Sequence, residues 1–206
     1  MSACGGVNTL MAFPCVKLPV LSGVLGRLAR TLGLSTPNPQ EIAVPTPKQR
    51  AIANLRFVRG LTDKLVAGIP DAKSTFQTTP TENHLAWTLG HLAISNMWFT
   101  SLVTGRKAHM PESYESLFGS KSTPKSDPKV YPPLAELKQH HAAQFEALIN
   151  ALEANADDAM TKLCVEDSGG FAKDMQDVAD RAAWHEGWHA GQLSSSRRAL
   201  GLPPVM

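Results

Sequence analysis

Several features that would assign this 206-residue chain to a particular protein class are scarce or missing. It has only three cysteines and no C-x2-C pair, which argues against a disulfide framework or a cysteine zinc site and favours a reducing, cytoplasmic location. No run of eighteen apolar residues occurs, so no transmembrane segment is predicted. The 20 Lys and Arg residues nearly balance the 18 Asp and Glu residues, which predicts no nucleic-acid partner.

The sequence does contain enough apolar material for one hydrophobic core. Hydrophobic residues make up 43% of the chain, too many for a disordered protein, and the length suits one domain with an extension. Pro45 and Pro47 end a proline-containing linker, so we place the boundary there. Residues 45–206 are predicted to form the domain, and residues 1–44 an N-terminal extension.

The predicted extension is basic and amphipathic, with Glu41 as its only acid. Its leucines recur at the spacing of one helix face: Leu21, Leu25, Leu28 and Leu32. Three interpretations are open, namely a targeting or membrane-surface segment, an extra helix on the main domain, and a loosely attached extension. We favour the last, because no positive charge precedes the apolar stretch as it would in a signal peptide.

Four segments with helical spacing of apolar residues, and none with strand alternation, predict an all-α fold built as a four-helix bundle. The first helix is expected to begin at an N-cap on Thr46 and to stop at Gly68. The others are expected over 81–103, from Pro133 to about residue 155, and over 173–200, with Gly201 following the last helix.

The connection over residues 105–133 is too long for an ordinary bundle loop of about 2–8 residues. It contains five prolines. One explanation is a crossover that connects the second and third helices without their being adjacent, and another is a flap over a functional site. The two explanations are compatible.

The strongest chemical signal is the segment W-H-E-G-W-H at 184–189. His185 and His189 are four residues apart, so on a helix they share one face and can bind one metal ion. The apolar stripe through Val178 and Ala182 leads to these positions, which predicts that both imidazoles face the core, where each needs a partner. The alternatives to a metal are two hydrogen-bonded core histidines or a solvated surface pair.

Two ligands hold a metal poorly, and no His, Asp, Glu or Cys follows His189. The third ligand is therefore expected upstream, on another helix. His91 lies among apolar residues of the second helix and is favoured over His141, which lies on the apolar stripe of the third. The remaining histidines are expected at a helix cap or in solvent (His84) and on the surface: His109 and His140.

The same segment also spells H-E-x-x-H, the signature of zinc proteases that use the glutamate as general base. The extended signature requires Gly and His where this chain has Gln192 and Ser195, and no strand is predicted that could present a peptide. We therefore do not favour a protease. Glu186 is expected on the helix surface or next to the metal ligands.

Gly187 and Gly191 lie four residues apart, beside these histidines. Each glycine costs about 1 kcal/mol relative to alanine inside a helix. Close approach of a neighbouring helix or of a ligand would explain both, with or without a function.

The segments N-H-L-A-W-T-L-G-H-L at 83–92 and W-H-E-G-W-H-A-G-Q-L at 184–193 together resemble the DinB/YfiT-like superfamily, and R-R-A-L-G at 197–201 fits the same pattern. The resemblance covers roughly residues 46–203. It implies a four-helix bundle with a long crossover connection, commonly a homodimer. It also implies a histidine triad, His91, His185 and His189, that binds a divalent metal ion, zinc and nickel being among those seen.

Some members of that superfamily are transferases that use a low-molecular-weight thiol, so the resemblance implies a metal-dependent transferase with a small-molecule substrate. A metal ion with an open position lowers the pKa of a bound water or thiol. Gln192 is predicted to hydrogen-bond a ligand or a group around the metal ligands. The alternatives are a non-catalytic bundle with a structural or regulatory metal, and a metal-dependent hydrolase. No catalytic residue is assigned.

Overall fold

The computed structural model describes residues 44–205, and the chain divides into two units after Val44. The second unit, Pro45–Met206, contains all of the described helices. The predicted extension and its amphipathic helix lie outside the described residues and stay predictions.

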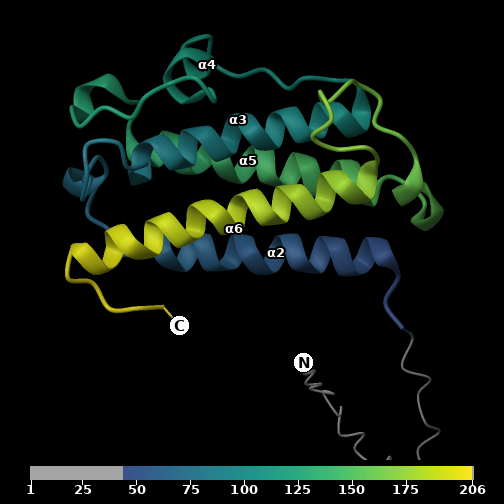
Figure 1. The fold of residues 1–206 in the computed structure, drawn as a ribbon, viewed down its shortest axis with the longest axis horizontal. Coiled ribbons are helices and arrows are strands. Elements are labelled where there is room, and N and C mark those ends of the chain that lie inside the picture. The colour runs from purple at the N-terminus through teal and green to yellow at the C-terminus, as the bar shows by residue number, and fades with distance from the viewer. Residues whose placement is uncertain (1–43, 206) are drawn as a thin grey trace, which may run out of the picture. The chain divides into compact units, whose positions relative to one another are not determined.

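Four helices of 20 or 25 residues make up the bundle, as the sequence predicts (Figure 1). They are α2 (Pro47–Val66), α3 (Leu85–Thr104), α5 (Leu134–Glu153) and α6 (Met175–Ala199). Helix α3 packs mainly on α5, and α2 mainly on α6. Between residues 44 and 205 the only β-type pairing is one isolated bridge, from Leu163 to Asp174, so the all-α fold class is confirmed.

Local sequence signals set most of the helix ends. Thr46 caps α2 in a capping box, in which its side chain accepts from the Gln49 amide at 3.2 Å and its own amide donates to the Gln49 side chain at 3.0 Å. Asp174 caps α6 by accepting from the Asp177 amide at 2.9 Å. Gly201 follows α6 with φ 75°, the left-handed conformation that glycine adopts readily.

The predicted start of the second helix, residue 81, is wrong by four residues. Helix α3 begins at Leu85, with His84 as its N-cap. The segment before it forms a tight turn instead, in which the Gln77 side chain donates to the Glu82 carbonyl at 2.7 Å and the Thr78 amide donates to the Glu82 carboxylate at 2.8 Å. These side-chain bonds compete with the helical backbone pattern and delay the helix.

The connection between α3 and α5 returns the chain to the end of the bundle at which α3 begins, so α3 and α5 run in the same direction (Figure 1). It contains the short helix α4 (Ser113–Phe118), which packs on α3, and the 3-10 turn η2 (Pro128–Val130). The crossover is therefore present, but the expectation that it joins non-adjacent helices is wrong, because α3 and α5 are direct neighbours. Two further 3-10 turns lie in the other connections: η1 (Asp71–Lys73) and η3 (Asp157–Thr161).

Two clusters of buried apolar residues form the core. One includes Phe99, Phe145 and the α6 residues up to Ala183, and the other includes Phe118 and the α6 residues from Ala190 onward. The polar turn of α6 that carries the histidines therefore lies between the two clusters. None of the helices within residues 44–205 is long and apolar enough to cross a membrane.

A candidate three-histidine metal centre

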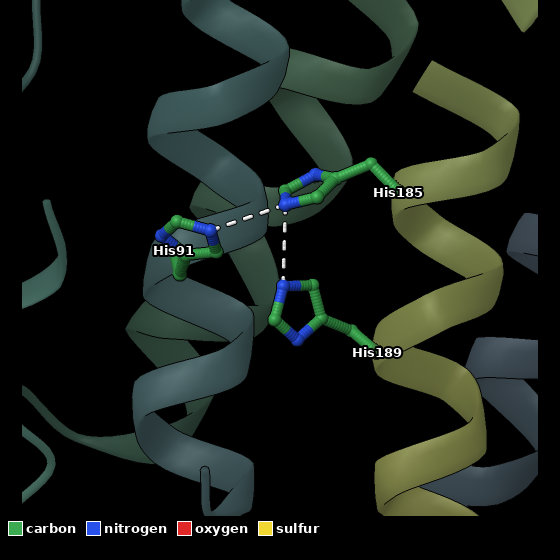
Figure 2. Close-up of side chains that lie close together, drawn as sticks. All are labelled: His91, His185 and His189. Carbon is green, nitrogen blue, oxygen red and sulfur yellow. Dashed lines mark hydrogen bonds between the residues drawn. The ribbon is translucent and has the colours of Figure 1, made fainter. Parts of the chain in front are cut away.

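The structure brings together His91 from the middle of α3 and His185 and His189 from α6 (Figure 2). The Nε2 atom of His185 lies 3.2 Å from Nε2 of His91 and 3.2 Å from Nε2 of His189. One ligand nitrogen from each ring lies within 4.8 Å of the others, a spacing at which the three could hold one metal ion. The i, i+4 spacing on α6 supplies two of these rings from successive turns.

The Nδ1 atoms of His91 and His189 point away from the centre, and their hydrogen bonds define the state of the Nε2 atoms that face it. The Nδ1–H group of His91 donates to the Phe118 carbonyl at 2.7 Å, since a carbonyl can only accept. His189 Nδ1 lies 2.9 Å from Gln192 Oε1, which also accepts from the Asn83 amide at 3.2 Å. Both rings therefore direct an unprotonated Nε2, with its lone pair, at the centre.

Binding to a metal ion satisfies these three nitrogens better than hydrogen bonds among the rings do. A neutral His185 carries at most one Nε2–H group, which can be donated to only one of its two neighbours at a time. One Nε2 lone pair would then remain unpaired in a mostly buried site. A single divalent cation accepts all three lone pairs, so the donor set matches that of a histidine-ligated metal.

Burial keeps the imidazoles in the neutral form that binds metals. It lowers the pKa of His185 to about 3, helped by the neighbouring His189 and His91 rings. It lowers the pKa of His189 to about 4 and also lowers the pKa of His91. At neutral pH none of the three rings therefore carries a positive charge that would oppose a cation.

The aromatic side chains around His91 restrict its movement. The indole of Trp87 stacks on it with ring centroids 4.5 Å apart and an interplanar angle of 12°. The indole nitrogen in turn donates to the Ser122 hydroxyl in the crossover connection at 2.8 Å. Sequence reasoning assigned no role to Trp87 or Phe118. The four-residue spacing of Trp87 and His91 on one helix could have predicted their contact. Phe118 is 27 residues from His91 in the sequence, so no local spacing relates the two.

The sequence profile described as the DinB superfamily matches residues 54–193. The chain belongs to the DinB superfamily. The matched range includes all three histidines and ends at the last residue of the second motif. No curated protein matches the chain.

The other histidines of this DinB-superfamily domain lie outside the triad. His84 is fully buried, not solvated: its Nδ1 accepts from the Trp87 amide at 3.2 Å and its Nε2–H donates to the Lys125 carbonyl at 2.9 Å. His109 is exposed, and His140 is half-buried. His141, the rival third ligand, is buried away from the triad and pairs with Glu186.

Of the two places expected for Glu186, the helix surface is wrong, because its side chain lies in the core and is 2% exposed. Its Oε2 lies 3.2 Å from Nε2 of His141, which is 1% exposed. Burial acts to raise the pKa of Glu186, but the His141 imidazole and the Arg59 guanidinium hold that pKa below its ordinary value. The carboxylate therefore binds α5 to α6 and is not available as the general base of a zinc protease.

Gly90 gives this DinB domain the space in which Phe118 packs. A Cβ atom at Gly90 would overlap the Phe118 ring, which is fully buried and whose own carbonyl holds His91. We expect Gly90→Ala to displace α4 and to weaken metal binding by about 10–100-fold, the usual loss when the hydrogen-bond partner of a ligand is removed. A competition titration with a coloured chelator measures this. Removing the ring in Gly90→Ala/Phe118→Ala should recover part of the loss, and an unchanged affinity in Gly90→Ala would contradict the argument.

Of the two explanations that the sequence suggested for the glycines of α6, close approach of a neighbouring helix is wrong. A Cβ atom at Gly187 or Gly191 would meet nothing within 4 Å, so neither a helix nor a side chain approaches closely. Both line a groove with Val58 and Leu61 of α2. Gly187→Ala and Gly191→Ala should therefore each raise the free energy of unfolding by about 0.5–1 kcal/mol in urea denaturation. A loss of stability would show that the groove is closed in solution.

Proposed function

We propose that this protein is a metal-dependent enzyme in which His91, His185 and His189 bind one divalent ion, zinc or nickel. The observation that carries the proposal is the convergence of three neutral imidazole nitrogens, two of them oriented by hydrogen bonds on their outer nitrogens. Within the described part of the chain no carboxylate or thiol joins this group. Structural zinc sites are almost always closed by four protein ligands, so three favour an open position and catalysis.

A divalent ion held by three imidazoles lowers the pKa of a water or thiol bound at its remaining position. The protein's own groups hold the ligands in place. Phe118 and Gln192 hold the outer nitrogens of His91 and His189, and Trp87 covers one face of His91. The site therefore needs little rearrangement when it binds a ligand.

We propose further that the reaction is the transfer of a low-molecular-weight thiol to a small electrophilic substrate. Membership of the DinB superfamily and the cavity described below support a small-molecule substrate over a protein one. A metal-dependent hydrolase would use the same site and differs only in the group that the metal activates. A cytoplasmic location and a homodimer stay predictions.

A cobalt-substituted sample tests the open position. Adding 2-mercaptoethanol is expected to produce a sulfur-to-cobalt charge-transfer band in the near ultraviolet, because a thiolate enters the metal's free position. The band should saturate at one thiol per chain and be absent from His189→Ala. A cobalt spectrum that neither thiol nor azide alters would indicate a closed site and favour the structural or regulatory alternative.

A further inference from the structure

A cavity of about 580 Å³ opens directly onto two of the three histidines, His91 and His185. This volume lies within the range of about 300–1,000 Å³ that is typical of small-molecule sites. The groove between α2 and α6 and three further cavities in the described part of the chain include none of the three histidines in their linings. The cavity beside the histidines is therefore the one from which a ligand can reach the metal position.

The wall of this cavity is aromatic. Trp98 and Phe99 come from α3, and Phe171 comes from the connection that precedes α6. Their ring centroids lie 5.2–5.8 Å from one another, which makes one continuous cluster. Phe99 also lies edge-on to the His185 ring, with centroids 6.2 Å apart, so the aromatic wall reaches the triad itself.

The charged lining of the cavity comes from the crossover connection. Lys107, Glu115 and Ser120 line it there, and all three are exposed to solvent. Glu115 and Lys107 carry opposite charges and form no ion pair within 4.0 Å of each other. A ligand in this cavity therefore meets two of the triad histidines, a cluster of aromatic rings and solvent-exposed charged groups.

We propose that the substrate taken by this cavity is a small molecule with an aromatic or bulky apolar body and one polar group that reaches the metal. The proposal rests on the metal site proposed above and names the substrate class for it. Trp98 and Phe171 are both only half-buried, so they retain apolar surface that a planar ring can cover. Small thiols are polar, so the aromatic wall suits the other reactant, the electrophile.

Two probes that differ only in the apolar body test this proposal on the zinc-loaded, full-length protein. Benzohydroxamate and acetohydroxamate share the same metal-binding group, and isothermal titration gives a dissociation constant for each. We expect benzohydroxamate to bind about tenfold or more tightly than acetohydroxamate, because its ring is removed from water against Trp98 and Phe171. In Phe171→Ala the ratio should fall toward one while the affinity for acetohydroxamate stays unchanged, which also shows that the variant is folded.

Trp98→Leu, which keeps most of the packed volume, is the second variant, and the same fall in the ratio is expected. Trp188→Ala is the matched control, because Trp188 is 57% exposed on α6 and does not line the cavity. Equal affinity for both probes, or a ratio that neither cavity variant lowers, would overturn the aromatic site and leave the metal site standing. If neither probe binds, the open metal position fails, and the substrate proposal fails with it.

Discussion

Metal affinity is expected to fall by more than about 100-fold when either His91 or His189 is replaced by alanine. Each substitution leaves two imidazoles, and the loss should exceed the roughly 10–100-fold effect of removing only a partner of a ligand. Equilibrium competition with a chelator gives the affinity, and mass spectrometry of the purified protein gives the metal content.

The controls for this experiment are histidines that the structure places elsewhere. His109→Ala removes an exposed imidazole and should retain one metal ion per chain. His141→Ala removes the rival ligand and should retain the metal in whatever fraction is folded, since His141 contacts Glu186 and not the triad. Equal metal in the wild type, His91→Ala and His189→Ala would remove the proposed site.

Truncating Glu186 is expected to cause the largest loss of stability in the domain. Glu186→Ala leaves His141 in the core without its partner, and breaking a buried pair in this way typically costs about 3–5 kcal/mol. The free energy of unfolding should be measured in urea on metal-free protein, so that metal binding does not contribute to it.

Glu186→Gln is the matched variant, because it keeps the shape and one hydrogen bond to His141 and removes only the charge. We expect it to be less destabilised than Glu186→Ala and to bind metal as the wild type does. A variant that loses its metal but keeps its stability would contradict the structural role and restore Glu186 as a group of the metal site.

The all-α bundle was predictable because its signals are local. The capping box at Thr46 and the left-handed glycine at Gly201 mark helix ends within a few residues of sequence. The start of α3 was not predictable in the same way. Whether residues 77–84 continue a helix or form a turn depends on the side chains of Thr78 and Glu82, whose hydrogen bonds exist only in the folded turn.

The candidate site likewise has a part that local sequence predicts and a part that only the folded chain shows. The spacing of His185 and His189 already places two rings on one helix face, but His91 and His141 both lie on apolar positions of other helices. Only the packed bundle shows that His91 of α3 faces the α6 pair while His141 of α5 faces Glu186. Residue spacing could not show either that Gly187 faces an open groove, or that Phe118 returns over Gly90 from the crossover connection.

The central claim is that three imidazoles of one chain bind a single metal ion and leave a position open. X-ray absorption of the zinc-loaded protein tests it most directly, because the spectrum reports the number and kind of atoms bound to the metal. We predict three imidazole nitrogens at about 2.0–2.1 Å and at least one further light atom that is replaced by sulfur when 2-mercaptoethanol is added. A spectrum with fewer than three imidazoles, or with a full set of protein ligands that the thiol does not change, would contradict the account.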